Sequence, residues 1–211
     1  MSSPPRITLA FTGASGMAYG LRLLECVIAA GCRVALVYSQ AAQIVARQEC
    51  DLVLSAQPRE TARALTARFQ AREGQLEVYG RDDWMAPIAS GTNAGDAMAI
   101  CPCTVGTLGS IANGLSDNLI ERAADVMLKE RRPLVLVPRE TPLSTIHLAN
   151  MLRLSVAGAV ILPPAPGFYG LPRTIEDIVD FVVARVLDQL RVPHTRGPRW
   201  AEPDVPPSLS V

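Results

Sequence analysis

The sequence ITLAFTGASG, residues 7–16, decides the fold class of this chain. Residues 7–12 form a short apolar run with β-branched and aromatic side chains, which is typical of a buried strand. A glycine-rich turn follows at residues 13–16, and residues 21–30 then repeat apolar side chains at helical spacing. A strand, a tight turn and a helix in this order predict the first unit of a parallel α/β sheet.

The alternation of strand and helix continues along the chain. Further strands are predicted at residues 34–38, 76–79, 97–100, 134–137 and 160–162, and further helices at residues 41–49, 58–69, 108–112, 118–130, 144–156 and 174–190. This pattern predicts an α/β fold: a Rossmann-like, doubly wound, mostly parallel sheet with helices on both faces, in a single domain. We place that domain at residues 1–193 and a proline-rich C-terminal tail at residues 194–211.

The composition argues for a small-molecule partner. Twenty basic and 20 acidic side chains in 211 residues give zero formal net charge, and no basic block is present, so we expect neither nucleic acid nor a membrane surface as a partner. No apolar run approaches the roughly 18–20 residues that span a bilayer. The five cysteines are odd in number and lack the spacing of a zinc site or a disulfide framework, which predicts a reducing, cytoplasmic location.

Two loops that follow predicted strands have the character of a nucleotide site. Residues 13–16 could hold an anion or a polar ring edge against helix N–H groups, and residues 101–107 offer the hydroxyls of Thr104 and Thr107. The spacing is not GxGxxG, and Ser39 stands where an NAD site usually has an acidic residue. NAD is therefore disfavoured, while FMN remains open, as does a tight turn without a ligand.

Several charged side chains lie where a ligand could meet them. Arg122 and Lys129, the only lysine, are seven residues apart on a predicted helix and share one face. They could bind an anion together, or they could form a solvated face paired with nearby acids. Glu140 follows Arg139 directly after the fifth predicted strand and is a candidate general acid or base. Arg185 lies in an apolar stretch, so it needs either a partner or a ligand.

Four segments in order resemble the flavin prenyltransferases of the UbiX type. They are TGASGMAY at residues 12–19, DNLIERAADVMLKERR at 117–132, LVLVPRETPLSTIHL at 134–148 and PGFY at 166–169, and the match covers residues 6–200. The resemblance implies transfer of a dimethylallyl group from dimethylallyl phosphate to reduced FMN, first at N5 and then at C6, without a metal. The implied product, prenylated FMN, would serve a partner decarboxylase of the UbiD type. The pathway served, ubiquinone biosynthesis or the breakdown of aromatic acids, stays open.

The resemblance also implies roles for individual residues. The FMN site would comprise Gly13, Ala14, Ser15, Ser39, Thr104, Val105, Gly106, Thr107 and Arg139. The phosphate of dimethylallyl phosphate would be held by Arg122, Lys129, Glu140, Tyr169 and Arg185, and the prenyl pocket would be lined by Glu49, Trp84 and Trp200. Ser15, Glu49 and Glu140 would be the catalytic residues. The cationic side chains are thus expected to converge on one pocket beside the flavin, and a homo-oligomer, a dodecamer by family resemblance, would have its sites at subunit contacts.

One departure and two alternatives accompany this interpretation. Many relatives have Ser-Met-Lys-Thr where this chain has TVGT at residues 104–107, so a cation is lost from that turn. Asp82 and Asp83 do not continue into a DDxxD cluster, which implies a monophosphate donor. The first alternative is an FMN-dependent decarboxylase that acts directly on an aromatic acid, such as 3-polyprenyl-4-hydroxybenzoate, or on a cysteine derivative. The second is an FMN carrier without enzymatic activity, which would not need the cationic set.

Overall fold

A six-stranded, wholly parallel sheet forms the centre of the molecule. The computed structural model describes residues 4–197, and its strand order is β3-β2-β1-β4-β5-β6. The strands are β1 (Arg6–Phe11), β2 (Arg33–Tyr38), β3 (Leu76–Tyr79), β4 (Ala97–Cys103), β5 (Leu134–Pro138) and β6 (Val160–Ile161). The order reverses between β1 and β4, and a crevice opens at such a point beyond the carboxyl ends of the strands. The predicted fold class is confirmed.

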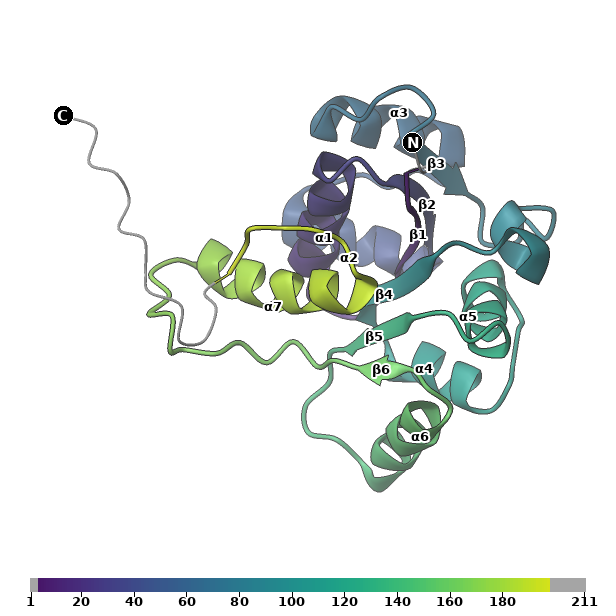
Figure 1. Ribbon diagram of the computed structural model, residues 1–211, viewed down its shortest axis with the longest axis vertical. Helices are drawn as coiled ribbons and strands as arrows, with labels where there is room; N and C mark the ends of the chain where they lie inside the picture. Colours follow the sequence, from purple (N-terminus) through teal and green to yellow (C-terminus); the bar gives the residue numbers. More distant parts are fainter. Residues whose placement is uncertain (1–3, 198–211) are drawn as a thin grey trace.

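Helices cover both faces of the sheet. They are α1 (Met17–Ala29), α2 (Gln40–Cys50), α3 (Pro58–Phe69), α4 (Val105–Ala112), α5 (Leu119–Lys129), α6 (Thr145–Val156) and α7 (Ile175–Leu190). One buried apolar cluster holds side chains of α1, α2, α3 and α7, and a second holds side chains of α4, α5 and α6. Figure 1 shows α1 and α7 on one side of the sheet and α4, α5 and α6 on the other. Residues on α5 and residues on α7 therefore lie on opposite faces.

The end of β4 differs from the prediction. The strand was expected to stop at Ile100, because proline lacks the N–H that a central strand donates. It runs on through Pro102 to Cys103, and its pairing with β5 shifts register between Ile100 and Cys103. The Pro102 carbonyl accepts hydrogen bonds from the Thr12 backbone N–H and hydroxyl. A register shift and these bonds from the neighbouring loop thus accommodate proline within the strand.

The first helix and the tail also differ in extent from their predictions. Helix α1 begins at Met17, directly after the turn, and not at residue 21. Residues 194–197, which we assigned to the tail, lie against α7, where His194 contacts Asp188 and Arg196 contacts Asp180. The boundary at residue 193 itself stays a prediction. Among the described helices, none is long and apolar enough to cross a membrane.

Close packing of α1 on β4 depends on a glycine and gives a first testable prediction. A Cβ placed on Gly20 would lie 2.4 Å from the carbonyl oxygen of Cys101. Although alanine is normally favoured over glycine inside a helix, we expect Gly20→Ala to lower the free energy of unfolding by about 1–3 kcal/mol. Urea unfolding followed by circular dichroism measures it.

The matched control is Gly109→Ala in α4, where the Cβ would meet only the movable amide nitrogen of Asn150, at 3.3 Å. We expect that variant to change the free energy of unfolding by less than about 1 kcal/mol. Equal effects at Gly20 and Gly109 would contradict the close helix–strand contact.

Candidate active site

Three helices begin at the edge of the sheet where the strands end. Helix α1 follows the turn after β1, α2 follows Ser39 after β2, and α4 follows Thr104 after β4. The buried hydroxyl of Thr12 joins two of these loops, since it donates to the Pro102 carbonyl at 2.8 Å and accepts the Thr104 backbone N–H at 2.8 Å. The loops after β1 and β4 are therefore held side by side at the switch in strand order.

The second loop exposes its backbone at Gly106, whereas the first loop packs on α2. A Cβ placed on Gly13 would lie 2.3 Å from the Cβ of Ala41, so the first loop packs directly on α2. A Cβ placed on Gly106 would meet the hydroxyl oxygen of Thr104 at 3.9 Å and otherwise open space within residues 4–197. Thr104 accepts the Thr107 backbone N–H at 3.1 Å and donates to the Thr107 hydroxyl at 3.0 Å. The backbone at Gly106 can thus approach a flat ring or a nucleotide, which fits FMN.

Glu49 occupies the N-terminus of α1. Its carboxylate accepts the backbone N–H groups of Gly16 at 2.9 Å and Met17 at 2.8 Å. The sequence left either an anion or a polar ring edge of a ligand open for these N–H groups. In the structure, a side chain of the protein itself supplies a negative charge there. Glu49 follows Gly16 by 33 residues, beyond α1, β2 and most of α2, so spacing alone could not assign it to this position.

The same carboxylate orients Ser15 and remains charged. Burial opposes ionisation, but the Ser15 hydroxyl, the two backbone N–H groups and the charge of Arg139 together lower the pKa of Glu49 below its ordinary value. Arg139 also donates from Nε to the Ser15 carbonyl oxygen at 3.2 Å. Ser15, Glu49 and Arg139, predicted separately, are brought together from the β1–α1 loop, α2 and the end of β5.

Ser39 of the predicted FMN site and Glu140 of the predicted phosphate site follow strands at the same edge of the sheet. Ser39 caps α2, where its hydroxyl oxygen accepts the Ala42 backbone N–H at 3.1 Å. Glu140 follows Arg139, is exposed, and accepts the Thr141 backbone N–H at 3.2 Å. Cys101 and Cys103 are buried, and burial raises the pKa of Cys103 to about 12, so these thiols are packed groups without reactivity at neutral pH.

The predicted phosphate residues do not converge within one chain. Arg122 and Lys129 lie on α5, where Arg122 pairs with Asp125 at 2.9 Å and Lys129 pairs with Glu130. Arg185 lies on α7, which covers the opposite face of the sheet. The expectation of one pocket formed by all of these cations is therefore wrong for a single chain. The position of a residue in a helical sequence indicates on which face of the helix the residue lies. It does not indicate which face of the sheet the helix covers.

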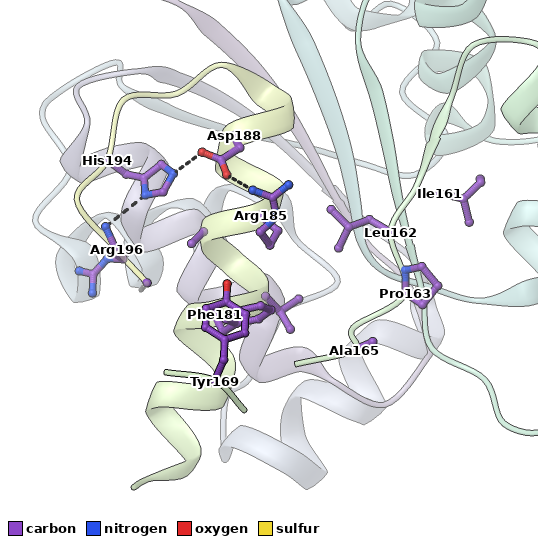
Figure 2. A pocket seen from close by; sticks show the side chains of 13 residues that line it. Ile161, Leu162, Pro163, Ala165, Tyr169, Phe181, Arg185, Asp188, His194 and Arg196 are labelled. Atoms are coloured by element: carbon purple, nitrogen blue, oxygen red, sulfur yellow. Dashed lines mark hydrogen bonds and ion pairs between the residues drawn. The ribbon is translucent and has the colours of Figure 1, made fainter. Parts of the chain in front are cut away.

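A cavity of about 720 Å³ lies beside Arg185, between α7 and the segment after β6. Figure 2 shows Tyr169, Phe181, Arg185, Asp188 and His194 around it. The rings of Tyr169 and Phe181 meet edge to face, with centroids 5.6 Å apart. The cavity thus offers an aromatic wall and a cation together. Trp84 lies half exposed outside this group, and Trp200 lies outside the described residues.

Two contributors to these sites were missed from the sequence. Thr12 was interpreted as the end of a strand, although its hydroxyl joins the two loops. Asp188 was not singled out, although it binds both Arg185 and His194. The sequence could have indicated the pair, because Asp188 follows Arg185 by three residues and about one helical turn brings their side chains together. Within residues 4–197, no group of three or more His, Cys, Asp or Glu side chains could hold a metal ion.

Comparison with known proteins identifies the family. The flavoprotein family model matches residues 1–187. The flavin prenyltransferase UbiX of Pseudomonas aeruginosa is 58% identical over 202 residues, which cover 96% of this chain and 97% of that protein. The chain belongs to the UbiX family of flavoproteins. The family membership predicted from the four sequence segments is thus confirmed.

Two solved structures of UbiX proteins have the same fold. The crystal structure of AnUbiX (PadA1) in complex with FMN and dimethylallyl pyrophosphate superposes with a TM-score of 0.83 at 40% identity, covering 95% of this chain and 99% of that chain. A dodecameric FMN-dependent UbiX-like decarboxylase from Escherichia coli O157:H7 gives a TM-score of 0.82 at 41% identity, covering 93% and 100%. The described architecture is therefore that of UbiX proteins over nearly its whole length.

The charge on Glu49 leads to a second prediction. A carboxylate whose pKa is lowered on folding stabilises the fold above its ordinary pKa of about 4.3, and this contribution is lost as the pH falls through the lower folded value. We expect Glu49→Gln to lower the free energy of unfolding at pH 7, and the difference from the wild type to shrink below about pH 4.

Urea unfolding at pH 7, 5 and 3.5 measures this difference. The control is Glu73→Gln, an exposed side chain in the loop before β3. A Glu49→Gln effect that stays constant over this pH range would show that the carboxylate is not held in its charged form.

Proposed function

We propose that this protein is a metal-independent flavin prenyltransferase that transfers a dimethylallyl group from dimethylallyl phosphate to reduced FMN. The observation that carries the proposal is the joining of Ser15, Glu49 and Arg139 beside the open face at Gly106. The 58% identity to a flavin prenyltransferase over nearly the full length supports it. FMN would lie against Gly13, Ala14 and Ser15 on one side and residues 104–107 on the other, with Ser39 and Arg139 at its edges.

Glu49 and Ser15 would accept a proton from the flavin. When bound, reduced FMN supplies the nucleophile that accepts the prenyl group. The Ser15 hydroxyl donates to a carboxylate that stays ionised, so its oxygen lone pairs are left to accept a hydrogen bond from a ring N–H. Glu49 can then receive the proton through Ser15, and Glu140 is the alternative acceptor. The charged Arg139 beside them favours the ionised carboxylate before the transfer.

The leaving phosphate would be stabilised by cations from more than one chain. Tyr169 and Arg185 line the cavity at α7, while Arg122 and Lys129 lie on the opposite face of the same chain. We propose that α5 of a neighbouring copy supplies Arg122 and Lys129, and that Glu140 lies nearby. Trp84 and Trp200 would exclude water from the allylic cation and face it with their rings.

An exposed apolar face on α6 supports assembly into an oligomer. Leu148, Leu152 and Val156 recur every four residues and are 52%, 66% and 81% exposed. Apolar side chains gathered on one helix face in this way are typical of a surface that another chain covers. A dodecamer, as in the Escherichia coli relative, is the assembly that we propose.

The proposed prenyl donor is dimethylallyl monophosphate, and the proposed recipient of the product is a decarboxylase. AnUbiX was crystallised with dimethylallyl pyrophosphate. We nevertheless favour the monophosphate, because the acids at residues 82–83 do not extend into the cluster that holds a magnesium-bound diphosphate. A decarboxylase of the UbiD type would receive the prenylated FMN, in the cytoplasm, and the pathway would be ubiquinone biosynthesis or the breakdown of aromatic acids.

Anaerobic incubation of the protein with reduced FMN and dimethylallyl phosphate tests the proposed function. We expect mass spectrometry to find a flavin heavier by one prenyl unit, and little product with the pyrophosphate. A flavin of unchanged mass would contradict the proposal. Release of carbon dioxide from an added aromatic acid, without change in the flavin, would instead favour the direct decarboxylase.

The shared phosphate site gives a third prediction. We expect Lys129→Ala and Arg185→Ala each to lower the rate of prenylation by roughly 100-fold, because each removes a cation from the leaving phosphate. If the two side chains act from different copies, dissociating the two variants together and reassembling them should restore about a quarter of the wild-type sites.

The control is each variant reassembled alone, which should regain nothing. Native mass spectrometry would show whether the two variants assemble together. If they do and the mixture recovers no prenylation activity, a site shared between copies is contradicted.

A further inference from the structure

Arg185 is the last member of a series of hydrogen bonds that begins in the chain after α7. The backbone N–H of Arg196 donates to Nδ1 of His194 at 3.1 Å, and His194 Nε2 lies 3.0 Å from Oδ1 of Asp188. The other oxygen of Asp188 accepts from Nη1 of Arg185 at 2.6 Å. The dashed lines in Figure 2 follow this series from Arg196 to Arg185 at the rim of the cavity.

The direction of these bonds follows from the backbone. An amide N–H can only donate, so Nδ1 of His194 is the acceptor, and the proton of the neutral ring resides on Nε2. His194 therefore donates to Asp188, whose carboxylate accepts one bond at each oxygen. A carboxylate fixed at both oxygens has a single orientation, and it holds the guanidinium of Arg185 at Nη1.

The segment that carries His194 is itself held on α7. Arg196 donates from Nη1 to Asp180 at 3.0 Å, and Arg22 on α1 binds both oxygens of the same carboxylate. Val192 is buried, and the side chain of His194 is only 9% exposed. Residues 192–197 thus form a strap, anchored at both ends, that presents one imidazole N–H to Asp188.

We propose that Asp188 and His194 are positioning residues for Arg185 in the binding of the prenyl phosphate. Within residues 4–197 Arg185 makes this one hydrogen bond, through Nη1, so its Nε and second amino group remain for a phosphate in the cavity. Asp188 turns the guanidinium toward the cavity that Tyr169 also lines, and His194 keeps Asp188 in place. This inference rests on the proposed function and adds two residues to its phosphate site.

Two substitutions at His194 separate positioning from simple support of the strap. In His194→Asn the amide oxygen can replace Nδ1 as acceptor of the Arg196 N–H, but the donor to Asp188 is lost. In His194→Gln the longer amide can replace Nε2 as donor. We expect His194→Asn and Asp188→Asn to raise the KM for dimethylallyl phosphate on the order of tenfold with kcat little changed, and His194→Gln to return the KM toward the wild-type value.

Prenylation kinetics with the oligomeric, FMN-loaded protein give KM and kcat, and flavin fluorescence gives the affinity for FMN, which we expect to stay unchanged. A wild-type KM in both His194→Asn and Asp188→Asn would overturn the inference. So would His194→Gln losing more than His194→Asn, because the bond to the backbone would then matter and the bond to Asp188 would not. A wild-type protein that forms no prenylated flavin would instead remove the proposed function.

Discussion

The carboxylate of Glu49 at the N-terminus of α1 is the interaction on which the candidate site depends. It binds the first N–H groups of the helix, orients the Ser15 hydroxyl and lies in the field of Arg139. These groups come from the β1–α1 turn with the start of α1, from α2 and from the end of β5, and only the common edge of a parallel sheet brings them together. The N-terminus of a helix commonly attracts an anion of a ligand. At α1 the carboxylate of Glu49 occupies that position, so the nearby surface is available for a flat ring.

The residues proposed to bind the phosphate are arranged differently from those proposed to bind the flavin. Within one chain, the cations expected to meet the leaving group cover opposite faces of the sheet and pair with acids on their own helices. The ion pairs of Arg122 and Lys129 on α5 are partly exposed and contribute little stability, so a phosphate can replace their acids at small cost. Asp188 remains bound to Arg185 on α7. The exposed apolar face of α6 and the dodecamer seen in a relative make a neighbouring chain the natural source of the missing half.

Much of the fold followed from sequence patterns, because each strand ends in a turn and each helix has an apolar stripe. The failures have physical causes. Pro102 continues β4, where the pairing with β5 shifts register, and no local pattern specifies such a shift. The loops that we propose for FMN were singled out by their glycine and hydroxyl content, whereas the position of Glu49 at the α1 N-terminus depends on how α2 packs. Asp188 and His194 were overlooked because their roles arise from the strap folding back on α7, which no local spacing specifies.

A crystal structure of the assembled protein with FMN and dimethylallyl phosphate tests the shared site most directly. We expect the flavin ring between residues 13–15 and 104–107, and one phosphate bound by Arg185 of one copy together with Lys129 of another. A phosphate bound by Arg185 with Lys129 of every copy facing solvent would contradict the central claim.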